Sequence, residues 1–182
     1  MDKLKQEYQV ETRWVGFPLH PETPQEGQTL EELFRGRNFD VREAMAHMAS
    51  VAASLGLPFG QRSMTYNSRR AQELAKWAEE QGRLEEYNRA AFHVYFAEGR
   101  NIAELPVLED IAARAGLDPA GVAPALAESR FAAAVDRDWA QSRKLGVTAV
   151  PTFLAGLEAV VGAQPYTSLE KLVQTAGAVR RG

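Results

Sequence analysis

The chain has 182 residues, of which 45% are hydrophobic and 25% are charged, and its formal net charge is −3. These values are typical of a globular protein with one domain, in which an insertion is also possible. The balance is mildly acidic, and nothing in it suggests the clustered basic face of a nucleic-acid-binding protein. No run of about 18 apolar residues predicts a membrane span. We therefore expect neither nucleic-acid nor membrane partners.

The opening segment, residues 1–7, lacks the apolar stretch of a secretory signal, so a cytoplasmic location is expected. The sequence contains no cysteine, which excludes disulfides, thiolate metal sites and cysteine nucleophiles in the chain as it stands. Its three histidines, at positions 20, 47 and 93, are too scattered to predict a metal site. We predict no catalytic residue, no metal and no cofactor from these residues.

An alternating segment lies close to the start of the chain. Polar and apolar residues alternate from Tyr8 to Phe17, and this pattern predicts a strand. Three prolines, the first at Pro18, then end it because proline cannot extend a ladder. The residues just before the strand, 4–7, are expected to be the end of a helix.

Helical spacing dominates from residue 40 to about residue 146. Asp40 and Glu43 predict a capping box before the first helix. Further helices are expected from Asn67 or Ser68 to Gly82, over 84–99, and over 105–116. Asp118 followed by Pro119 predicts another helix start, after which the helix resumes to residue 145 with a break near 129.

The character of the sequence changes at Gly146. Residues 147–155 and 159–161 are rich in β-branched residues and predict two short strands joined by a turn at Gly156. A last amphipathic helix is expected after Pro165. The predicted order is therefore strand, helical block, strand, strand and helix.

Several local motifs in this order resemble those of one protein family. They are Trp14–Glu22, Asn67–Ala71, Phe96–Ile102, Gly146–Phe153 and Gly162–Pro165. Together they resemble FrnE-like members of the DsbA family, whose activity is thiol–disulfide exchange. The resemblance implies an α/β, thioredoxin-like fold, incomplete at the N-terminus, with a large all-helical insertion. The thioredoxin-like part would be residues 1–38 and 146–182, and the inserted helical domain residues 39–145.

The front of the chain departs from the family pattern. The family begins with a central strand, a Cys-x-x-Cys turn and a helix, whereas this sequence resembles it only from the end of that helix. Elements of mean length would add roughly 20 to 30 residues. Without cysteine the chain itself cannot exchange disulfides. We expect the remaining strands to pair directly or to borrow a strand from another copy in a homodimer, unless the working protein is longer.

The resemblance also implies a substrate-binding loop. The family's proline at the position of Pro151 is cis, so the backbone of Val150, with Thr152 after it, would pair with an extended peptide or a glutathione-like thiol ligand. Four further residues are candidates for a groove: His20, Asn67, Phe92 and Phe96. An aromatic stripe such as Phe92 and Phe96 is more often core, and His20 more often an ordinary loop residue.

Arg69 and Arg70 offer a further candidate, for an anionic substrate, since they lie at a predicted helix start where backbone N–H groups favour anions. A solvated pair of surface charges is the more common outcome for such residues.

Two alternatives to the oxidoreductase function also stay open. One is a glutathione-dependent isomerase or transferase, like 2-hydroxychromene-2-carboxylate isomerase or kappa-class glutathione transferase. That branch usually has a Gly-Gln-Asp-Arg type run where this chain has Gly162–Pro165. The other is a non-catalytic binding module, which the absence of cysteine favours.

Overall fold

The computed structural model describes residues 1–182, which form two compact units. One unit, here called the helical unit, is residues 20–136, and the other, here called the hairpin unit, is residues 1–19 with 137–182. The sequence-based division differs at both boundaries. Residues 20–38 belong to the helical unit because Asn67 and Asn101 donate side-chain hydrogen bonds to the carbonyls of Thr23 and Gln25, both over 2.8 Å. Residues 137–145 belong to the hairpin unit, where the Gly16 N–H donates to Asp138 Oδ2 over 2.9 Å.

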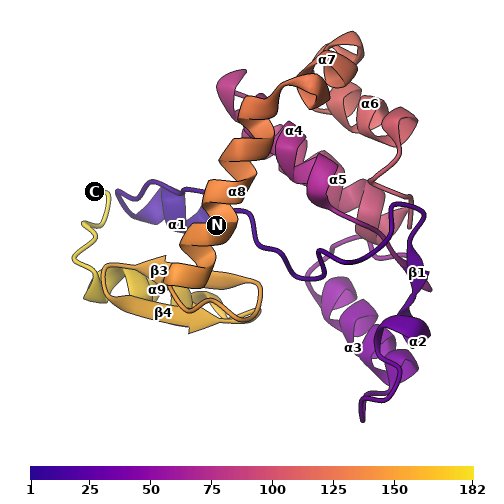
Figure 1. Ribbon diagram of the computed structural model, residues 1–182. Helices are drawn as coiled ribbons and strands as arrows, with labels where there is room; N and C mark the ends of the chain where they lie inside the picture. Colours follow the sequence, from indigo (N-terminus) through magenta and orange to yellow (C-terminus); the bar gives the residue numbers. More distant parts are fainter. The chain divides into compact units, whose positions relative to one another are not determined.

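Most of the regular structure of the helical unit is helix (Figure 1). In chain order they are α2 (Leu30–Leu33), α3 (Val41–Ser54), α4 (Arg69–Glu80), α5 (Leu84–Phe92), the π-helical turn η1 (His93–Ala97), α6 (Leu105–Arg114), the 3-10 turn η2 (Pro119–Gly121) and α7 (Val122–Ala127). The helix α8 (Ser129–Lys144) contributes its first half to this unit and its second half to the hairpin unit. The helices predicted between residues 40 and 146 are thus confirmed.

The core of the helical unit lies among α4, α5, α6 and α7. Leu74, Val94, Leu108, Ile111 and Val122 are completely buried there. On α6, for example, Leu108 and Ile111 are three residues apart and so share one face of the helix, which is why the apolar periodicity locates this core. The helix ends also follow the sequence, since a glycine with positive φ comes directly after the C-cap residue of α4 and of α6.

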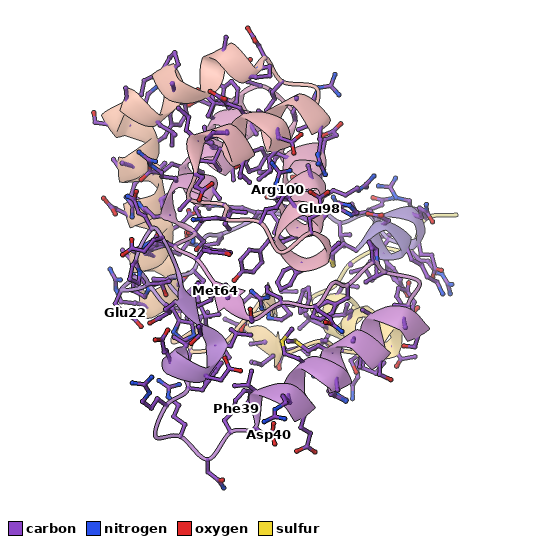
Figure 2. The ribbon with its side chains drawn as sticks, turned by 90° about the vertical axis from the view of Figure 1, so that its right-hand side faces the viewer. Glu22, Phe39, Asp40, Met64, Glu98 and Arg100 are labelled. Carbon is purple, nitrogen blue, oxygen red and sulfur yellow. The ribbon has the colours of Figure 1, made fainter.

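The start of α3 shows half of the predicted capping box. The Glu43 N–H donates to Asp40 Oδ1 over 3.0 Å, but no return bond from the Glu43 side chain forms. Figure 2 labels Asp40 here, directly after Phe39. A complete capping box forms instead at α2, where Thr29 and Glu32 satisfy each other's backbone N–H groups.

A two-residue ladder in the helical unit was not predicted. The strand β1 (Gln28–Thr29) pairs antiparallel with β2 (Met64–Thr65). Gly27, at φ +87°, precedes β1, and a Cβ there would stand 2.4 Å from the Tyr66 ring. Only glycine fits this close approach. The ladder is too short to show the alternation by which strands are recognised in a sequence.

The hairpin unit contains α1 (Asp2–Glu7), the end of α8, the strands β3 (Thr152–Ala155) and β4 (Glu158–Val161), and α9 (Tyr166–Thr175). Figure 1 shows β3 and β4 as an antiparallel hairpin with α9 beside them. Leu4, Tyr8 and Val173 are buried together between α1 and α9. The Tyr8 hydroxyl donates to Glu170 Oε1 over 2.8 Å and accepts from Gln174. The predicted hairpin and last helix are confirmed.

The strand predicted over residues 8–17 is wrong. Only Tyr8 makes a bridge, to Arg180, and the following residues are irregular. The direct pairing expected between the remaining strands does not occur either, since β3 pairs with β4 alone. An alternating segment becomes a strand only where a partner strand satisfies its backbone groups, and residues 179–181 pair with residues 7–9 alone.

Candidate functional site

The predicted binding loop leads directly into β3. The peptide bond between Val150 and Pro151 is cis. The Gly162 N–H donates to the Pro151 carbonyl over 2.7 Å, which extends the hairpin by one hydrogen bond. The Thr152 hydroxyl donates to the Ala149 carbonyl over 2.6 Å and so holds the loop against the start of the strand.

The register of the hairpin decides which backbone groups stay free. Phe153 faces Val160, and Leu154 faces Ala159. Hydrogen-bonded and non-hydrogen-bonded pairs alternate in an antiparallel ladder, and the bond at Pro151 fixes the phase. The backbone groups of Phe153 therefore point to β4, whereas those of Thr152 and Leu154 point to the opposite edge. We call this row, with Val150 before it, the open edge of β3.

The open edge is accessible within the hairpin unit. Val150 and Leu154 are 44% and 47% exposed, main chain and side chain together. Neither the N–H nor the carbonyl of Val150 makes a hydrogen bond to the chain. Unpaired, exposed backbone groups of a strand are a template for a further strand. The arrangement can therefore bind an extended polypeptide through main-chain hydrogen bonds.

Asn67 is hydrogen-bonded to the loop that contains His20, in the helical unit. Asn67 Nδ2 donates to the carbonyls of Pro21 and Thr23 over 3.3 and 2.8 Å, and its Oδ1 accepts from the Arg69 N–H. Both ends of this amide are thus used to hold the loop to the start of α4. His20 lies 3.6 Å from Glu22 and packs edge-on against the Phe34 ring.

Phe92 and Phe96 belong to a different group of side chains in the same unit. Their ring centroids lie 6.3 Å apart, and Phe96 also stacks against Phe59 at 6.3 Å and contacts Tyr95 at 4.9 Å. Phe92 is 50% exposed, so this aromatic cluster reaches the surface. No hydrogen bond or ring contact joins it to His20 or Asn67.

The two arginines at the start of α4 are occupied. Arg69 donates to Glu73, to Asp136 and to the Ala132 carbonyl at 2.6 to 2.9 Å. Arg70 donates to the Ala103 carbonyl over 3.2 Å. The anion site considered at this pair does not form, because Arg69 has its anions within the chain.

A second set of charges forms a network across η1 and α6. Glu98 pairs with Arg100 and Arg114, and Asp110 pairs with the same two arginines. Figure 2 labels Glu98 and Arg100, which lie close together. The pKa of both carboxyl groups is lowered, chiefly by hydrogen bonds from Arg114 and also by those from Arg100. No group of three His, Asp or Glu side chains is placed to hold a metal ion.

None of the helices combines the length and the apolar character needed to cross a bilayer.

A family model described as the DSBA-like thioredoxin domain matches residues 1–174. The chain belongs to the DSBA-like thioredoxin domain family. This confirms the predicted family and its thioredoxin-like fold, and the helical unit of residues 20–136 is consistent with the predicted helical insertion.

Solved structures and a curated protein are similar to this DSBA-like chain. A probable DsbA oxidoreductase from Streptomyces coelicolor matches with a TM-score of 0.83 and 28% identity, over 93% of this chain and 76% of that one. A candidate protein disulfide isomerase from Nitrosomonas europaea, at 14% identity and a TM-score of 0.64, covers 82% of this chain and 75% of its own, and shows the fold alone.

The uncharacterized protein YwbO of Bacillus subtilis (strain 168) is 33% identical over 99 residues. That stretch is 53% of this DSBA-like chain and 49% of YwbO, so the match spans about half of the curated relative. The assignment to the FrnE-like branch stays a prediction.

Sequence reasoning named the loop at Val150–Thr152 but missed one residue beside the aromatic cluster. Arg62 lies with its guanidinium carbon 4.4 Å from the centroid of the Tyr95 ring. A single arginine between two polar residues, Gln61 and Ser63, carries no periodic or motif signal. Only the folded chain brings it onto the aromatic rings.

Proposed function

We propose that this chain is the substrate-binding side of thiol–disulfide oxidoreductase chemistry in the DsbA family. The observation that carries the proposal is the open edge of β3, which begins at the cis Val150–Pro151 bond. An extended peptide, or a glutathione-like thiol compound with a peptide backbone, would add to this edge as a strand. The chain has no cysteine, so the exchanging thiols have to come from the ligand and from another molecule or segment.

A second candidate is a non-catalytic peptide-binding module, and the absence of cysteine favours it. Both candidates use the open edge in the same way, and they differ in whether a dithiol acts on the bound peptide. An assay of disulfide reduction separates them when a dithiol protein is added. If the chain speeds the reduction of a bound peptide disulfide, the oxidoreductase role is supported. If it binds the peptide without changing the rate, the module is supported.

The edge itself is tested with two proline variants. Leu154→Pro removes an N–H that points to the open edge, whereas Ala159→Pro removes one from the outer edge of β4. We expect the first variant to weaken binding of an extended disulfide peptide by at least about 10-fold, and the second to leave it within about 2-fold. Equal affinities for both variants and the unaltered chain would remove the edge from the proposal.

Two further expectations belong to the proposal. An open edge also invites pairing between copies, so a homodimer joined through β3 would compete with the peptide. Sedimentation at several concentrations, with Leu154→Pro beside the unaltered chain, measures this competition. The cytoplasmic location stays a prediction, and fractionation of the producing cells tests it.

A further inference from the structure

The guanidinium group of Arg62, in the helical unit, has N–H donors for which the chain supplies no acceptor. Its Nε and Nη1 atoms are both buried, and neither has a hydrogen-bond partner. Arginine keeps its positive charge and has donors only. Buried donors of a charged group are normally matched by an acceptor, so an orphaned pair indicates a missing partner.

The group is held on a fixed aromatic surface. The guanidinium carbon lies 4.4 Å from the centroid of the Tyr95 ring and 5.2 Å from that of Phe96. Both aromatic residues lie in η1, a π-helical turn. Such turns are rare within helices and are frequent at functional sites. The Tyr95 hydroxyl is tied to Thr65 Oγ1 over 3.1 Å, which fixes the ring beneath the arginine.

The loop that carries Arg62 is also tied to η1 through the backbone. The Gly60 N–H donates to the Phe96 carbonyl over 2.9 Å. A Cβ at Gly60 would stand 2.2 Å from the Ala97 carbonyl oxygen, so only glycine allows this approach. These contacts hold the backbone of the loop, two residues before Arg62, against η1.

Two other arginines of the helical unit have carboxylate partners. Arg69 is paired with Glu73, and Arg100 is paired with Glu98 and Asp110. Nε and Nη1 of Arg62 have no such partner, so this guanidinium offers its positive charge to a ligand. One charge on a planar fork of donors matches a carboxylate better than a phosphate, which carries more charge. The adjoining rings of Tyr95 and Phe96 suit an apolar or aromatic body.

We propose that Arg62, together with Tyr95 and Phe96, binds the carboxylate of a small ligand or of a peptide end that has an aromatic or aliphatic body. The inference uses residues of the helical unit alone and does not rest on the peptide proposed for the edge of β3. Because Nε and Nη1 are shielded from solvent in the free chain, side chains above them have to move before the ligand binds. We therefore expect a dissociation constant on the order of 1 mM.

A titration of the whole chain followed by NMR tests this site, with the Arg62 side-chain Nε–H signal as the reporter. The probe is N-acetyl-phenylalanine, and its matched control is the amide of the same compound, which lacks the negative charge. We expect saturable shifts with the carboxylate and at least about 10-fold weaker binding of the amide. Equal binding of the two probes overturns the proposal, and so does the absence of any shift at concentrations on the order of 10 mM.

Two variants, each of which removes one positive charge, are titrated in the same way. Arg62→Gln should weaken carboxylate binding by about 10- to 100-fold. Arg42→Gln removes an exposed positive charge from α3 and should leave binding within about 2-fold. Binding to Arg62→Gln as tight as to the unaltered chain overturns the proposal. If Arg62→Gln fails to fold, the comparison of acid and amide on the unaltered chain decides the question alone.

Discussion

Gly162 donates its N–H to the carbonyl of Pro151 over 2.7 Å, and this bond fixes which edge of the hairpin is free. It makes Pro151 and Gly162 a hydrogen-bonded pair, so that the backbone of Thr152 must point away from β4. The turn at the other end of the hairpin gives the same alternation of hydrogen-bonded and non-hydrogen-bonded pairs. Gly156 has a φ of +61°, which suits the first central position of a two-residue turn. The open edge is thus a consequence of the register.

The buried face of α4 should contribute strongly to stability. Leu74 is completely buried, and Leu74→Ala is expected to lower the free energy of unfolding by about 2–5 kcal/mol. Met48, on α3, is 40% exposed, and Met48→Ala should cost less than about 1 kcal/mol. Urea unfolding followed by circular dichroism measures both. Similar losses for the two variants would contradict the assigned core.

The charge network at Glu98 and Asp110 should make the helical unit sensitive to acid. The pKa of each carboxyl group is lowered from its ordinary value of 4.5 or 3.8, chiefly by Arg114. A lowered pKa in the folded state contributes stability above the unfolded value, and this contribution is lost as the pH falls through the folded value. Stability should therefore fall below about pH 4.5. The two side chains are 28% and 33% exposed, so solvent screens the effect, which is small and weakens with salt.

The variant Arg114→Gln tests the origin of this acid sensitivity. It should reduce the stability at pH 7 and flatten the dependence of stability on pH below about 4.5, since two carboxyl groups lose their main partner. Arg42→Gln, with the same change of charge at an exposed position, is the control. Thermal unfolding curves at a series of pH values measure both. An unchanged slope in Arg114→Gln would show that the acid sensitivity arises elsewhere.

Helices and the hairpin could be read from the sequence because local signals specify them. Apolar residues at helical spacing, glycine stops and the turn at Gly156 all act over a few residues. The strand expected from Tyr8 onwards failed because a strand needs a distant partner, and no local pattern reveals whether one is present. The ladder at Gly27–Thr29 was missed for the opposite reason, since its pairing is fixed by close backbone approach rather than by alternation.

The candidate site was predictable only in part. The resemblance located Val150–Thr152, but the direction of the free backbone groups depends on the register, which no sequence pattern gives. Asn67 was expected in a groove, and its amide is instead used to hold the loop of residues 20–24. Arg62 gave no signal at all, because its surroundings are assembled from segments about 33 residues apart along the chain.

Asn67 should therefore matter for stability rather than for binding. Asn67→Ala leaves the carbonyls of Pro21 and Thr23 without their donor, and it should cost about 1–3 kcal/mol. It should also speed proteolysis of the loop of residues 20–24. The affinity for an extended peptide should stay within about 2-fold of the unaltered chain. A loss of affinity without a loss of stability would return Asn67 to the binding site.

The open edge of β3 is the feature on which peptide binding depends most, and amide hydrogen exchange of Thr152 and Leu154 tests it most directly. In the free, dilute chain both N–H groups point to the open edge, so they should exchange much faster than that of Phe153, which faces β4. Adding an extended disulfide peptide should slow the exchange of Thr152 and Leu154 and leave Phe153 unchanged. If Thr152 and Leu154 exchange as fast with a saturating peptide as without it, the edge is not where this protein binds its substrate.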